Sequence, residues 1–230
     1  DNAIPREACA VIVAEPDKKG YLEDTVEKVG EELKQELQTK DPEVLVVVEE
    51  VEERTSKCLS EEDTKRLISL LFAAPKGVQA MSADIKGLVE TSLNMGIVDL
   101  KDDRAMLQFS VRSSLEGAKR VLIEKLENIA AMTGASQEVR GDYPGWAYKK
   151  ESPFRDKSVE VFCRLYGKEP KIQAIHAGLE CGLLSAKIPG LECISIGPDM
   201  KDIHTTEERL SISSTERVWN YVLELLKQKG

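Results

Sequence analysis

The chain has 230 residues, of which 41% are hydrophobic and 32% are charged, and its formal net charge is −9. This acidic balance argues against a nucleic-acid-binding protein, and no apolar run approaches the roughly 20 residues that a membrane-spanning helix needs. The five cysteines are odd in number and irregularly spaced, which indicates a reducing compartment rather than a disulfide framework. No secretory leader is visible, so we expect a cytoplasmic protein.

The first third of the chain predicts strands and helices in alternation. Residues 7–14 (EACAVIVA) and 41–53 (DPEVLVVVEEVEE) contain short apolar runs rich in β-branched residues, which are typical of strands. Residues 18–40 repeat apolar side chains every three or four positions, which predicts an amphipathic helix. Residues 60–77 predict a second helix that ends before a Pro-Lys-Gly turn, with Ser60 as its N-cap.

The middle of the chain predicts a hairpin, a helix and one more strand. Residues 87–114 alternate in polarity around Asp102-Asp103, as the two arms of a hairpin do. Ser114 is a candidate N-cap for a helix over 115–134, and a strand is expected over 135–144. The order β-α-β-α-β-β-α-β predicts an antiparallel or mixed sheet with helices on one face.

A turn-rich stretch, Tyr143–Trp146, marks the expected boundary between a first domain, 1–142, and a second segment, 143–230. The second segment alternates helices and strands in the manner of a parallel α/β sheet. Its helices are expected at 154–167, 179–186 and 214–228, and its strands at 171–177 and 191–197. Two strands cannot bury both faces of a parallel sheet, so we expect the end of a larger α/β domain. The start of the sequence, without methionine and close to a strand-like run, also favours a fragment.

His204 is the candidate metal ligand, because it follows the strand-like 191–197 run in a polar loop at the edge where α/β sheets bind ligands. A solvated or capping histidine is the other interpretation. A catalytic zinc needs about three protein ligands, and no second ligand is spaced suitably, so the chain alone does not encode a complete metal site.

Three further positions could carry chemistry. Glu180, between two glycines where a strand gives way to a helix, could hold a substrate ammonium or only contact the helix dipole. Arg112, at the end of a strand, could receive a carboxylate in two parallel hydrogen bonds or form a surface ion pair. A Cys181–His176 nucleophilic pair is conceivable but has no identifiable orienting side chain.

Six motifs occur in an order that resembles a known family. They are NAIPREA (2–8), LVETSLNMGIV (88–98), VRSS (111–114), YPGW (143–146), IHAGLECGL (175–183) and SIGPDMKDIHTTEE (195–208). Together they resemble the aminoacyl-histidine dipeptidases, also called Xaa-His or cytosol non-specific dipeptidases. These belong to the co-catalytic zinc exopeptidases. The resemblance covers essentially the whole chain.

The resemblance implies an α/β (α+β) fold in two parts. The first is a lid domain, 1–142, whose β-sheet is covered by helices on one face and whose N-terminal part is missing. The second, 143–230, is the C-terminal segment of an α/β zinc-exopeptidase catalytic domain. The full-length enzyme would be a homodimer that hydrolyses dipeptides with two divalent metal ions, expected to be zinc. The chain by itself is expected to be inactive, and neither nucleic acid nor membrane is expected as a partner.

The resemblance also assigns roles to individual residues. His204 is the family's final metal ligand, although Thr205-Thr206 stand where the family usually has Ser-Pro. Substrate-binding residues are expected at Asn2, Arg112, Gly178 and Glu180. No catalytic residue is expected in this chain, because the motifs that carry the other ligands and the general-base glutamate are absent from it. A non-catalytic lid or assembly fragment and a Cys–His hydrolase stay open as alternatives.

Overall fold

The computed structural model describes residues 5–51, 57–101, 104–174, 180–203 and 205–228. Close contacts within the chain divide it into two compact units, Pro5–Ile68 and a larger unit that contains Ser69–Gly230. Helix α2 (Glu61–Ala73) crosses from one unit to the other. The expected boundary between Asp142 and Tyr143 stays a prediction.

The unit Pro5–Ile68 contains a short 3₁₀ turn, η1 (Pro16–Lys18), the long helix α1 (Lys19–Leu37) and the start of α2. The helix expected over 18–40 is therefore confirmed. Residues 44–51 lie along α1: a Cβ on Gly30 would lie 3.4 Å from Val46, and Lys19 pairs with Glu50 at 2.8 Å. None of the described residues of this unit is buried.

The strands expected over 7–14 and 41–53 are wrong for the residues that the structure describes, which contain no strand there. Val11, Ile12, Val13 and Leu45 remain exposed. Their β-branched composition favours an extended backbone, but a strand also requires a hydrogen-bonded neighbour. Helix α2 is confirmed, and Ser60 caps it: its Oγ accepts the backbone N–H of Asp63 at 3.0 Å.

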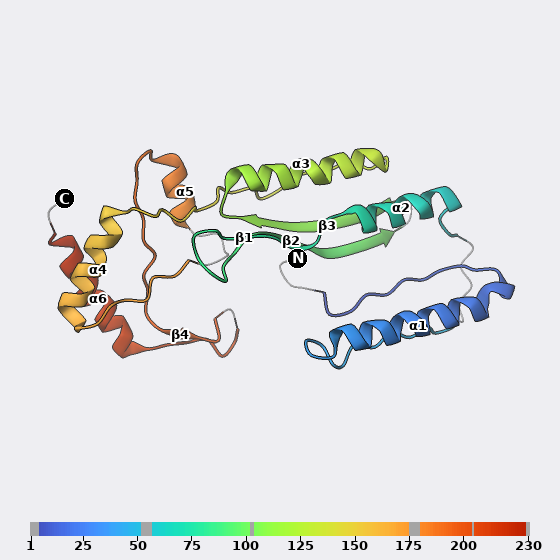
Figure 1. Ribbon diagram of the computed structural model, residues 1–230, viewed down its shortest axis with the longest axis horizontal. Helices are drawn as coiled ribbons and strands as arrows, with labels where there is room; N and C mark the ends of the chain where they lie inside the picture. The colour runs from blue at the N-terminus through green and yellow to red at the C-terminus, as the bar shows by residue number, and fades with distance from the viewer. Residues whose placement is uncertain (1–4, 52–56, 102–103, 175–179, 204, 229–230) are drawn as a thin grey trace. The chain divides into compact units, whose positions relative to one another are not determined.

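A three-stranded antiparallel sheet in the order β1-β2-β3 is the centre of the larger unit. The expected hairpin is confirmed as β2 (Val89–Lys101) and β3 (Arg104–Ser113). β1 (Gly77–Met81) was not expected, because this short stretch carries little alternation. Helix α3 (Glu116–Met132) lies along β3 (Figure 1) and covers one face of the sheet.

The buried cluster beneath α3 joins helix and sheet. Leu122 and Leu126 of α3 meet Leu93 of β2 and Ala74, with Phe109 and Val111 of β3 packed against them. Burying one leucine contributes about 1.5–3 kcal/mol, so this cluster fixes α3 on the sheet. Ser114 is not the N-cap: Leu115 occupies that position without a side-chain cap, and the Ser113 hydroxyl accepts the Leu115 N–H. The strand expected over 135–144 does not form.

The three helices expected in the C-terminal segment are confirmed as α4 (Pro153–Tyr166), α5 (Glu180–Lys187) and α6 (Ile212–Leu226). α4 and α6 lie side by side (Figure 1). Between them Val161 is fully buried, and the buried Tyr221 hydroxyl donates to the Ser158 carbonyl at 2.8 Å.

The two strands expected in this segment are not observed. Residues 171–174 and 191–197 contain no assigned strand, and residues 175–177 lie outside the described residues. A small two-stranded ribbon, β4 (Met200–Lys201) with β5 (Arg209–Leu210), was not expected.

Candidate functional site

Arg112 is the half-buried penultimate residue of β3, as the sequence predicted, and it faces Ser92 of β2. The strand end beside it is fixed by the hydroxyls of Thr91 and Ser113, which lie 2.8 Å apart. Val111 packs against the core under α3, and side chains alternate along a strand. Arg112 therefore projects from the sheet face opposite α3.

A row of polar side chains shares this face with Arg112. Ser92 pairs with Arg112 and Asn94 pairs with Ser110, and these four positions have the parity opposite to the core residues Leu93 and Val111. All four take part in further interactions within the protein. Sequence reasoning missed the three neighbours of Arg112. The alternation in Thr-Ser-Leu-Asn at 91–94 was the signal that could have found them.

A buried lysine fixes the crossing segment, residues 142–146, to α3. The Lys119 ammonium donates to Asp142 Oδ1 at 2.7 Å and to the Tyr143 carbonyl at 2.6 Å, and it lies 3.1 Å from Glu116 Oε1. Glu116 in turn accepts the Gly145 N–H at 2.6 Å. Burial lowers the pKa of Lys119, but its hydrogen bonds to Asp142 and Glu116 outweigh burial and hold the pKa above its usual value.

Two glycines let the crossing segment lie between β3 and α5. A Cβ on Gly145 would lie 2.6 Å from the carbonyl oxygen of Ser114, and one on the buried Gly182 would lie 2.9 Å from that of Pro144. Both distances are too short for any side chain. The end of β3 and helix α5 are thus held against the same short stretch of backbone.

Glu180 is the first residue of α5 and is exposed, which agrees with the predicted position at a helix start. Gly178 and His176 lie outside the described residues. Asn2, the other predicted substrate-binding residue, also lies outside them.

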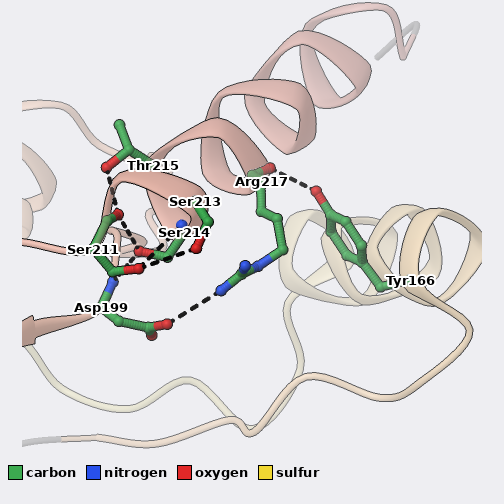
Figure 2. Close-up of polar contacts among 7 residues, drawn as sticks. All are labelled: Tyr166, Asp199, Ser211, Ser213, Ser214, Thr215 and Arg217. Carbon is green, nitrogen blue, oxygen red and sulfur yellow. Dashed lines mark hydrogen bonds and ion pairs between the residues drawn. The ribbon is translucent and has the colours of Figure 1, made fainter.

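The 199–211 loop, which contains the position of His204, begins at Asp199, and several polar contacts hold Asp199 in place (Figure 2). The Asp199 N–H donates to Ser214 Oγ at 2.9 Å, and its carbonyl accepts the Ser211 N–H at 3.0 Å. Its carboxylate pairs with Arg217 at 3.2 Å, and the Arg217 carbonyl accepts the Tyr166 hydroxyl of α4. The first turn of α6 therefore fixes both ends of the 199–211 loop.

The loop turns sharply around Asp202 and Thr205. Asp202 has a φ of 52°, in the left-handed region that aspartate tolerates better than most residues. The Thr205 hydroxyl donates to the Asp202 carbonyl at 2.7 Å and accepts the Glu207 N–H at 3.2 Å. The Thr205 that stands in place of the expected serine thus supports a tight turn. His204 itself lies outside the described residues.

A cavity of about 1640 Å³ opens inside the larger unit. Arg112 lines it from β3, Trp146 from the crossing segment, and residues 171–174 and 191–196 from the segments before and after α5. Glu180 does not line it. Arg112 and the runs 171–174 and 191–196 therefore line one cavity.

The remaining chemistry of the described residues is limited. Burial raises the pKa of the Cys181 thiol, which is the opposite of what an activated cysteine nucleophile needs, so the Cys–His interpretation loses support. Among the described residues, no three His, Cys, Asp or Glu side chains are grouped as metal ligands. No helix in the described part of the chain is long and apolar enough to cross a bilayer.

Comparison with known proteins gives relatives both by sequence and by structure. The chain is 37% identical to the cytosol non-specific dipeptidase of Escherichia coli K12 over 228 residues, which is 99% of this chain and 47% of that protein. It superposes on the crystal structure of aminoacylhistidine dipeptidase from Vibrio alginolyticus with a TM-score of 0.84 and 30% identity, covering 93% of this chain and 44% of the other. No family model matches. The chain thus spans about half the length of the relatives it matches.

Proposed function

We propose that this chain is part of a metal-dependent dipeptidase that hydrolyses Xaa-His and other dipeptides. The observation that carries the proposal is a similarity, in both sequence and fold, that runs along nearly the whole chain and leads to two proteins named as dipeptidases. A match of this length is hard to reconcile with a shared local motif alone.

In this proposal the chain supplies the C-terminal half of the enzyme, with a lid domain at 1–142 and the end of the catalytic domain at 143–230. The runs 171–174 and 191–196 line the cavity and contain no strand in the structure. Their sequences are nevertheless typical of strands, so we propose that their strand neighbours come from further polypeptide.

Arg112 is the proposed carboxylate receptor. Its position at the end of β3, on a polar sheet face, supports the role, because a guanidinium can grip a carboxylate through two parallel hydrogen bonds. Ser92, Asn94 and Ser110 are proposed to surround the same group. Glu180 is proposed to hold the substrate's ammonium, with Asn2 and Gly178 as further substrate-binding positions.

His204 is the proposed single metal ligand of this chain. The support is the resemblance of the surrounding motif together with the firm anchoring of its loop on α6. We propose that the enzyme binds two divalent ions, zinc by preference. Polypeptide outside this chain would supply their remaining ligands and the general base. The metals would polarise the scissile carbonyl when bound. The whole enzyme is proposed to be a cytoplasmic homodimer.

Hydrolysis of Xaa-His dipeptides by the complete natural polypeptide that contains this chain tests the proposal. We expect turnover that a chelator abolishes and zinc restores, and we expect none from residues 1–230 alone. A complete polypeptide that carries metal but hydrolyses no dipeptide would contradict the proposal. Zinc-dependent turnover by residues 1–230 alone would contradict the division into halves.

A further inference from the structure

Cys181 of α5 and Cys193 both lie where α5 contacts the run 193–194. The Cys181 thiol donates to the carbonyl of Ile194, the residue after Cys193, at 4.0 Å, and, besides burial, the Cys193 thiol is one of the groups that raise the pKa of Cys181. Ser185, one turn further along α5, donates its hydroxyl to the Cys193 sulfur at 3.6 Å. Both cysteines are half-buried and present as free thiols.

The backbone on each side of this pair is held in place independently. Gly182 sits against the Pro144 carbonyl, which fixes α5. Glu192, the residue before Cys193, accepts the Ser152 hydroxyl at 2.8 Å and the Phe154 N–H at 2.9 Å at the start of α4. The two thiols are therefore brought together by the fold rather than by their own contact.

We propose that Cys181 and Cys193 are an oxidisable dithiol, which a low-molecular-weight disulfide converts into an intramolecular disulfide. One thiolate attacks the reagent, RSSR, and forms a mixed disulfide while RS⁻ leaves. The second cysteine, after losing its proton, attacks the protein sulfur of that mixed disulfide and expels the second RS⁻. In sum, two protein thiols and one RSSR give one protein disulfide and two RSH. The proposal rests on these contacts alone and does not require the proposed dipeptidase activity.

Burial controls how the reaction proceeds. Because burial raises the pKa of Cys181, little of this thiol is ionised at neutral pH, and closure is slow there and faster as pH rises. Cys9 and Cys58 are exposed and have no such neighbour among the interactions described above. They should stop at reversible mixed disulfides. The disulfide would covalently link α5, which begins at Glu180, to the run 191–196.

The test is equilibration of the 230-residue chain with oxidised glutathione, alkylation of the remaining thiols and mass analysis of unreduced tryptic peptides. Cys181 and Cys193 fall in the adjacent tryptic peptides 172–187 and 188–201, so the disulfide appears as one linked pair that reduction separates. We expect this pair from the wild type and from Cys163→Ser, and not from Cys193→Ser. Cys163 is the matched control because it is also half-buried but lies in α4.

Repeating the glutathione equilibration in urea measures how much the folded structure favours formation of the disulfide. We expect the constant for closing the pair to be at least about tenfold larger in the native chain, a difference of about 30 mV in reduction potential. Three results would overturn the proposal: peptides 172–187 and 188–201 recovered unlinked, cross-linked dimers as the main product, or equal constants with and without urea.

Discussion

Replacing Lys119 with methionine should loosen the crossing segment from α3. Methionine keeps an unbranched apolar stem in a site where the lysine residue is only 8% exposed, but it removes the ammonium group. The lost hydrogen bond to the Tyr143 carbonyl joins a charged donor to a backbone group and is worth about 1.5–3 kcal/mol. The lost pairs to Glu116 and Asp142 add little, because both carboxylates are 59% exposed and water replaces the ammonium.

We therefore expect Lys119→Met to lower the free energy of unfolding by about 2–3 kcal/mol. Urea unfolding followed by the fluorescence of the half-buried Trp146 measures this, in a Trp219→Phe background that leaves one reporter. Arg120→Met is the matched control. Its side chain is 74% exposed and only 3.8 Å from Glu124, so its effect should stay within about 0.5 kcal/mol.

The pH dependence gives the experiment a second readout. The folded-state pKa of Lys119 is raised, so its contribution to stability is fully present below the unfolded value of 10.5 and is lost as pH rises through the folded value. The difference between wild type and Lys119→Met should thus be constant from pH 7 to 9 and shrink in stronger alkali. Equal unfolding midpoints for Lys119→Met and Arg120→Met would refute the reasoning.

Four further predictions follow from the site. In the complete polypeptide, Arg112→Lys should reduce kcat/KM for dipeptides about 30- to 1000-fold, the kinetic equivalent of about 2–4 kcal/mol, since lysine cannot form two parallel hydrogen bonds to a carboxylate. Dipeptide amides lack that carboxylate, so their kcat/KM should change little. An equal loss for the acid and the amide would make Arg112 a structural residue. His204→Ala should remove bound metal, measured by elemental analysis, together with turnover, while circular dichroism stays unchanged; full metal content would exclude it as a ligand. Gly145→Ala should cost about 1–3 kcal/mol of stability, because its Cβ meets the Ser114 carbonyl; an unchanged melting temperature would contradict this. The hydrogen bonds from the Phe154 N–H and the Ser152 hydroxyl lower the pKa of Glu192. Its contribution to the free energy of unfolding is therefore present above its unfolded pKa and is lost as pH falls through its folded pKa. Glu192→Gln should make stability less dependent on pH in this acidic range, and an unchanged pH dependence would contradict this.

The helices could be predicted from the sequence because their signals are local. The apolar spacing in 18–40 and the serine that precedes 61–73 act within a few residues, and both helices form. Strand formation depends on a partner that can be distant in sequence. Residues 7–14 and 191–197 have the composition of strands, yet neither pairs with a described neighbour, and composition alone does not supply one.

The candidate site was predictable to a similar extent. Arg112 lies at a strand end as expected, because alternation in the hairpin fixes which face each residue occupies. The contacts of Lys119 with the Tyr143 carbonyl and of Gly182 with Pro144 join segments that no local pattern links, so the sequence did not reveal them. Ser114 failed as a cap because the chain enters α3 one residue later. The roles of Asn2, Gly178 and His204 remain predictions.

The anchoring of Asp199 on α6 has a consequence for the entropy of ligand binding. A segment joined only through its covalent ends loses conformational freedom when a ligand orders it, and closing a loop of this size costs roughly 2–3 kcal/mol. Here the hydrogen bonds among Asp199, Ser211 and Ser214 close the 199–211 loop during folding. That loss is therefore part of the folding equilibrium, and a ligand that contacts the loop does not have to supply it. Substituting alanine for Ser214 removes one of these closing bonds, while the Ser211 N–H bond and the β4–β5 pairing remain, so it would transfer only part of the cost to binding.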